Sequence, residues 1–126
     1  MLDIKTIDSV SSLKDLDGFN PSNKGYTSIA KDLSTQARKC YQERKFDKAL
    51  ENYKKALEIF EVKLDPTHET IAKVYNNIGV TYRAKEEYAY SIVYFKKGLE
   101  IYEKLPDKIF EVGIITNEIA IAYKNQ

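Results

Sequence analysis

The stretch YKKALEIFE at residues 53–61 recurs 42 residues later as FKKGLEIYE at residues 95–103. Residues upstream of it repeat at the same distance: Leu33, Ala37, Cys40, Phe46 and Ala49 correspond to Tyr75, Gly79, Tyr82, Tyr88 and Ser91. A third, partial copy follows 41 residues on, where Thr116, Ile119, Ala120 and Tyr123 correspond to Tyr75, Ile78, Gly79 and Tyr82. A fixed period of this length is typical of supersecondary units that stack and share one continuous core.

Hydrophobic residues follow a helical period from Tyr26 onward, and no segment alternates with period two. Proline in the connections at Pro66 and Pro106 ends one helix before the next. We predict an all-α, right-handed solenoid of antiparallel helix pairs, about two and a half repeats long, over residues 26–126. The expected helices are 27–43, 46–63, 68–84, 87–104 and 108–124. Residues 1–25 are expected to form a tail, or a short amphipathic helix through Ile7, Val10, Leu13 and Leu16.

The pattern resembles the tetratricopeptide repeat. The residues that carry the resemblance are Tyr75, Ile78, Gly79, Tyr82, Tyr88, Ser91, Phe95 and Gly98, which stand at the spacing of that family. The 42-residue period, and the phrase LDPTHETIAKVYNNIG at residues 64–79, are similar to the kinesin-light-chain type of the repeat. The resemblance covers residues 28–124. It implies binding of a protein or peptide and does not name the partner.

Composition and charge exclude several classes of function. The net charge of +1 gives no field that would attract nucleic acid or a membrane surface. No apolar run approaches the roughly 18 residues of a membrane span. The single cysteine, Cys40, cannot form an intrachain disulfide and fits a reducing compartment. With no basic or long apolar N-terminal stretch to suggest secretion, we expect a cytoplasmic protein.

Catalytic groups and cofactor sites are not indicated. The single histidine, His68, falls in a connection and is interpreted as a helix-start residue. Cys40 falls at a core position and is interpreted as a small buried hydrophobic residue without a histidine to activate it. One histidine and one cysteine cannot build a zinc site. We therefore expect no enzyme activity, no metal and no cofactor.

A groove remains as the candidate site, because the resemblance implies that the first helix of each pair lines a concave surface. Asn77 matches the asparagine with which such repeats hold a peptide backbone, and two of the three arginines project from this face. Arginine binds carboxylates through paired hydrogen bonds, so we expect a protein or peptide ligand with acidic residues. The expected groove residues, with Thr35 and Glu118 beside them, are Ser34, Arg38, Tyr41, Asn76, Asn77, Val80, Arg83, Asn117, Ile121 and Lys124.

The last predicted helix is apolar around most of its circumference, which indicates burial on more than one side. Its expected contact residues are Ile114, Ile115, Ile119 and Ala122. Self-association through this helix is our leading interpretation. The alternatives are cover by the segment around Ile7–Leu16, by another protein, or by further residues of a longer chain. We therefore expect a non-catalytic scaffold or adaptor that binds a partner peptide or helix, with a structural subunit of a larger assembly as the alternative.

Overall fold

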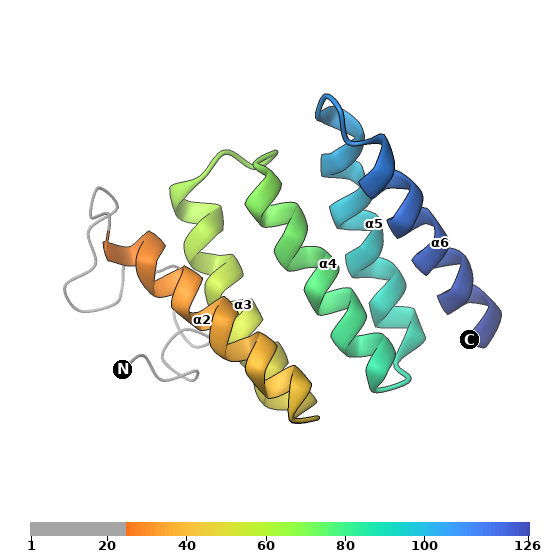
Figure 1. Ribbon diagram of the computed structural model, residues 1–126, viewed down its shortest axis with the longest axis horizontal. Coiled ribbons are helices and arrows are strands. Elements are labelled where there is room, and N and C mark those ends of the chain that lie inside the picture. Colours follow the sequence, from red (N-terminus) through yellow and green to blue (C-terminus); the bar gives the residue numbers. More distant parts are fainter. Residues whose placement is uncertain (1–24) are drawn as a thin grey trace.

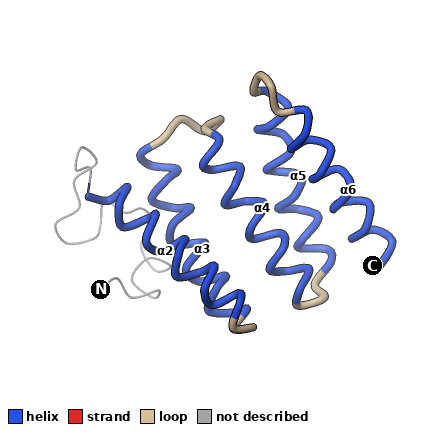
Figure 2. The backbone as a smooth tube through the Cα atoms, in the orientation of Figure 1, coloured by secondary structure: helices blue, strands red, loops and turns tan. Residues whose placement is uncertain are grey.

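Five α-helices and no strand make up the part of the chain described by the computed structural model, residues 25–126 (Figures 1 and 2). The expected tail or helix within residues 1–24 lies outside the described residues. The helices agree with the predicted ranges to within one or two residues, so the all-α repeat architecture is confirmed. They are α2 (Gly25–Gln42), α3 (Phe46–Lys63), α4 (Glu69–Ala84), α5 (Tyr88–Lys104) and α6 (Ile109–Asn125).

Each helix packs on the one before it: α2 on α3, α3 on α4, α4 on α5 and α5 on α6 (Figure 1). Alternate helices also meet, because Arg83 of α4 forms an ion pair with Glu118 of α6. On the other side, Lys97 of α5 lies close enough to Glu61 of α3 to oppose the rise that burial causes in the pKa of Glu61. The chain therefore forms two layers, one of α2, α4 and α6 and the other of α3 and α5.

The core lies between these two layers and is built from the repeated positions. Ala37 and Ala49 of the first pair are fully buried, as are Ile78 and Phe95 of the second. Gly79 is a point of close approach within the second pair, since a Cβ added to it would lie 2.8 Å from Cδ1 of Phe95. Small residues admit the neighbouring helix and aromatic rings fill the remaining space.

The turns inside the two pairs are also copies of each other. Lys45 donates its backbone N–H to the carbonyl of Cys40 at 2.8 Å, and Glu87 donates to Tyr82 at 2.9 Å. These six-to-one hydrogen bonds define Schellman ends of α2 and α4. The residue before each donor, Arg44 or Glu86, has a φ of 62°, in the left-handed region that favours glycine.

The connection between the pairs is organised by residues 65–68. Asp65 accepts hydrogen bonds from the backbone N–H and the hydroxyl of Thr67, at 2.8 and 2.6 Å. His68 is the N-cap of α4, and its Nδ1 accepts from the backbone N–H of Thr70 at 3.0 Å. The interpretation of His68 as a helix-start residue is confirmed, and the cap fixes where α4 begins.

Candidate peptide-binding groove

The layer of α2, α4 and α6 carries the ten residues predicted to line the groove. The most consequential contact in this layer is the ion pair between Arg83 and Glu118. Their side chains are 29% and 20% exposed, so the pair is partly withdrawn from water. Arg83 is thus already bound to a carboxylate of the chain, and its guanidinium is not freely presented to a ligand.

Arg38, the other arginine of this face, is exposed on α2. It interacts with the hydroxyl of Tyr53 on α3. Burial raises the pKa of that hydroxyl, and the nearby guanidinium opposes the rise. Arg38 therefore lies where its charge can reach solvent while its head group is oriented by a core tyrosine.

Ser34 and Asn76 stand 42 residues apart at equivalent positions, and the structure gives them the same environment. The Ser34 Oγ and the Asn76 Oδ1 are both buried and neither has a hydrogen-bond partner. A buried polar atom without a partner is unfavourable. These oxygens are covered in this arrangement, and the place of Ser34 and Asn76 in a ligand-binding groove stays a prediction.

Three further predicted groove residues are half-buried and take part in packing. Tyr41 lies against Phe46, with ring centroids 5.5 Å apart at an angle of 58°. Val80 packs against the core. The Asn77 side chain is half-buried, and its backbone carbonyl accepts a hydrogen bond from the Thr81 hydroxyl at 2.8 Å. These three side chains are therefore partly covered by the packing of this layer.

Asn117, Ile121 and Lys124 of α6 are exposed. Two residues that were not predicted for the groove, Phe110 and Ile114, share this face, because 110, 114 and 121 are spaced at one side of a helix. Phe110 is 74% exposed and Ile114 is 46% exposed. The corresponding residues of α4 are Glu69 and Lys73. Comparison of the repeats by register could have found this apolar stripe in the sequence.

The structure divides the four residues predicted for self-association. Ile115 and Ala122 are buried at 2% and 0% exposure, and Ile119 packs against the core as well. Because α5 is the helix on which α6 packs, these residues belong to the fold of the single chain. Of the four residues, Ile114 alone is exposed, at 46%, and self-association through α6 stays a prediction.

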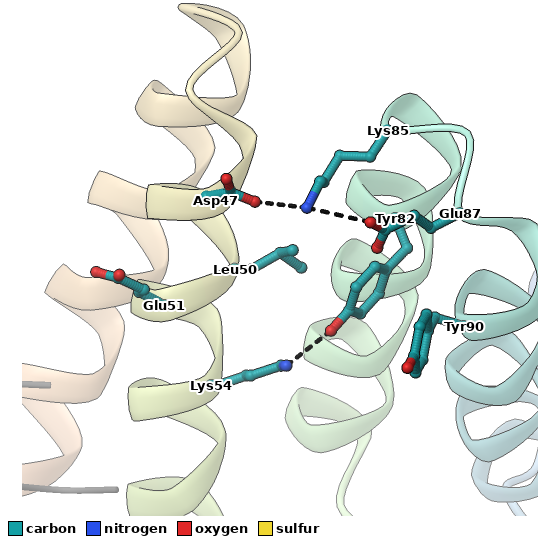
Figure 3. A pocket seen from close by; sticks show the side chains of 8 residues that line it. All are labelled: Asp47, Leu50, Glu51, Lys54, Tyr82, Lys85, Glu87 and Tyr90. Carbon is teal, nitrogen blue, oxygen red and sulfur yellow. Dashed lines mark hydrogen bonds and ion pairs between the residues drawn. The ribbon is translucent and has the colours of Figure 1, made fainter. Parts of the chain in front are cut away.

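A cleft of about 530 Å³ lies between α3 and the end of α4, outside the predicted groove (Figure 3). Three of its charged groups are paired with one another: Lys85 lies 2.5 Å from Asp47 and 3.4 Å from Glu87. The Lys54 ammonium donates a 2.7 Å hydrogen bond to the Tyr82 hydroxyl. The exposed ring of Tyr90 stacks on Tyr82 at 5.2 Å. We interpret the cleft as the contact between the two pairs.

Other kinds of site find no support within residues 25–126. No group of three or more histidine, cysteine and acidic residues is arranged to hold a metal ion in this part of the chain. Cys40 is half-buried and packs against the core, as its position in the repeat predicted. No helix among those described is long and apolar enough to cross a membrane.

The comparison with known families agrees with this geometry. The model of the tetratricopeptide repeat matches residues 33–104, which run from the middle of α2 to the end of α5. The chain therefore belongs to the tetratricopeptide repeat family. Repeats of this family are generally protein–protein interaction modules. No curated protein matches the sequence.

Proposed function

We propose that the protein is a non-catalytic adaptor or scaffold that binds a partner peptide or helix on the layer of α2, α4 and α6. The observation that carries the proposal is the ion pair between Arg83 and Glu118, because it brings the first helices of two successive repeats into direct contact. A ligand can then bridge several repeats on one continuous face. The 42-residue period favours the kinesin-light-chain type of repeat.

The proposed ligand has acidic residues together with at least one large apolar side chain. Arg38 and Lys124 are exposed cations at opposite edges of this face. Phe110, Ile114 and Ile121 expose apolar surface on α6, the helix that also carries Lys124. A peptide with carboxylates for the two cations and an apolar side chain for α6 would match both features. We place this interaction in the cytoplasm, where a single half-buried cysteine is stable as a thiol.

The experiment that tests this proposal is affinity capture followed by quantitative mass spectrometry. The bait is the chain of residues 1–126, compared with Asn117→Ala and Lys124→Glu variants. Both side chains are exposed, so neither variant should lose helix content by circular dichroism. A partner of this face is expected to be depleted by both variants and retained by Glu51→Ala, an exposed residue of α3. A partner captured equally by all four proteins would place binding elsewhere.

A structural subunit of a larger assembly is the second candidate, and one observation favours it. Ile109 and Phe110 are 87% and 74% exposed at the start of α6. Apolar contiguous surface of this kind marks an interaction site. Sedimentation velocity at micromolar concentration separates the candidates, since an adaptor is expected to stay monomeric and a self-associating subunit to form a larger species.

A further inference from the structure

In each complete helix pair, the second helix covers the first along a seam of small residues. A Cβ on Gly79 would lie 2.8 Å from the Phe95 ring, and a Cβ on Gly98 would lie 3.2 Å from the backbone oxygen of Ala72. Both Gly79 and Ala72 are buried as a result. In the first pair the corresponding residues are Ala30 and Ala37. Both are fully buried, and their helix α2 packs on α3.

Helix α6 lies on α5 in the same way as α4 lies on α3. Lys54 donates a 2.7 Å hydrogen bond to the Tyr82 hydroxyl, and its ammonium is 5.2 Å from the ring centroid. Lys96 makes the same two contacts with Tyr123, at 2.7 and 5.3 Å. This repeated contact shows that α6 has the same orientation on α5 as α4 has on α3. It therefore identifies the face of α6 that matches the face of α4 covered by α5.

That face is uncovered on α6. Gly113 and Ala120 correspond in register to Ala72 and Gly79, and both are exposed. A Cβ built on Gly113 would meet nothing within 4 Å. Tyr123 is 51% exposed, whereas its counterpart in α4 is 8% exposed. Ile109, at 87% exposure, lies on the same side of the helix at one end of this surface. We call residues 109, 113, 116, 120 and 123 the α6 seam.

We propose that the α6 seam is the docking site for an amphipathic helix of a partner protein that runs antiparallel to α6. The chain itself shows the pattern that this helix needs: a small residue, an aromatic residue four positions later and a second small residue three positions after that. In α3 the pattern is Ala49, Tyr53 and Ala56, and in α5 it is Ser91, Phe95 and Gly98. The aromatic ring would cover Ala120, and the second small residue would lie against Gly113.

The same pattern argues against occupants taken from this chain. Within residues 1–24 the only aromatic residue is Phe19, which has Asp15 four positions before it and Pro21 two positions after it. The stripes of α3 and α5 in a second copy are buried in its own core. Helix α6 has no aromatic residue between two small residues at this spacing. Because these segments of residues 1–126 do not fit, we assign the occupant to a different protein.

This inference goes beyond the groove proposal, because it concerns another side of α6. The groove face carries residues 110, 114 and 121, and the seam carries residues 109, 113 and 120. With 100° per residue, the centres of the two sets are separated by roughly a quarter of the helix circumference. Loss of groove binding and loss of seam binding can therefore be measured separately.

The probe for the test is a fluorescein-labelled peptide with the sequence of residues 87–105, which contains the α5 stripe. Its binding to the chain of residues 1–126 is followed by fluorescence anisotropy. Isolated helices of this length are marginal in water, so weak binding in the micromolar to millimolar range is expected. The control peptide carries Phe95→Glu. The protein variants are Gly113→Leu, which fills the seam, and Val62→Ser, which removes an exposed apolar side chain of α3.

We expect the wild-type protein to bind the probe. The Phe95→Glu peptide and the Gly113→Leu protein should each weaken binding about tenfold or more, as overpacking and a buried charge would do. The Val62→Ser protein should bind as the wild type does. Because Gly113 has open space around it, Gly113→Leu should keep its helix content; if it does not, Ala120→Leu fills the same seam from another position.

Three results would overturn the proposal. The first is absence of binding to the wild-type protein, or equal binding to Gly113→Leu. The second is a wild-type dimer in sedimentation that Gly113→Leu abolishes, since a second copy would then occupy the seam. The third is an increase of tenfold or more in probe binding after deletion of residues 1–24, since the N-terminal segment would then cover it.

Discussion

Arg83 of α4 and Glu118 of α6 form an ion pair that joins the first helices of successive repeats. The pair connects two helices that are separated in sequence by the whole of α5. It also occupies the arginine that the sequence pointed to as a ligand-binding group. The same contact therefore joins two repeats and reduces the positive charge that Arg83 offers to a ligand on this face.

The first prediction concerns this pair. Arg83→Gln and Glu118→Gln should each lower the free energy of unfolding, and the double variant should lose less than the sum of the two. Because both side chains are partly exposed, the coupling is expected to be about 0.5–1 kcal/mol. Urea unfolding of the four proteins measures it. Strictly additive losses would mean that the pair contributes nothing to the array.

The second prediction compares two glycines in helices. Gly79→Leu should lower the free energy of unfolding by about 1–3 kcal/mol or more, because the side chain would enter the space of the Phe95 ring. Gly113→Ala should instead raise it by about 0.5–1 kcal/mol, since a helix-interior glycine gains from a Cβ where there is room. Thermal unfolding followed by circular dichroism measures both. If Gly113→Ala instead lowered the free energy of unfolding as Gly79→Leu does, the face of α6 around Gly113 would be covered in solution.

The third prediction concerns the two Schellman turns. Arg44 and Glu86 hold a left-handed φ of 62° that costs a residue with a Cβ about 1 kcal/mol. Arg44→Gly and Glu86→Gly are each expected to raise the free energy of unfolding by up to about that amount. Glu86→Ala is the matched control, because alanine removes the charge and keeps the Cβ. If alanine stabilises as much as glycine, the backbone conformation is not the cause.

Most of the fold was predictable from the sequence because the determinants are local and repeated. The recurrence of residues 53–61 at 95–103 set the register, and the small residues at 37 and 79 marked the packing of each pair. The positive φ values were not predicted, because Arg44 and Glu86 are not residues that favour the left-handed region. Their six-to-one hydrogen bonds depend on backbone geometry that residue type alone does not reveal here.

The candidate site was less predictable because it depends on contacts between repeats. Register placed Arg83 and Glu118 on one face but could not show that they bind each other across two helices. It could not show that the Ser34 and Asn76 oxygens are covered. The apolar count of α6 indicated burial, but only the packing on α5 shows that Ile115 is inside and Phe110 outside. These outcomes follow from tertiary placement, which periodicity does not specify.

The fourth prediction concerns alkaline stability. Burial raises the pKa of Tyr102 to about 12, and the carboxylates of Glu69 and Glu111 add to the rise. Below about pH 10, the pKa of a tyrosine in the unfolded chain, Tyr102 keeps its phenolic proton in both the folded and the unfolded state. The neutral side chain then makes its full contribution to the free energy of unfolding. Between about pH 10 and pH 12 the Tyr102 hydroxyl ionises in the unfolded chain but not in the folded one. The free energy of unfolding therefore falls by up to about 2–3 kcal/mol over this range.

Chemical denaturation of the wild type and Tyr102→Phe from pH 8 to pH 12 measures this contribution. The phenylalanine variant should lose less stability over the range, although burial also raises the pKa values of Tyr53 and Tyr75 and leaves part of the loss in place. Identical losses in the two proteins would show that Tyr102 ionises as easily in the folded chain as in the unfolded one.

Site-specific photo-crosslinking tests the central claim most directly, because it asks which layer contacts a partner. A benzoylphenylalanine is placed at exposed Asn117 of α6 in one protein and at exposed Glu51 of α3 in another. After irradiation in cell extract, mass spectrometry identifies the cross-linked chains. A partner bound on the layer of α2, α4 and α6 should cross-link from position 117 and not from position 51. A partner that cross-links only from position 51 would contradict the proposed binding face.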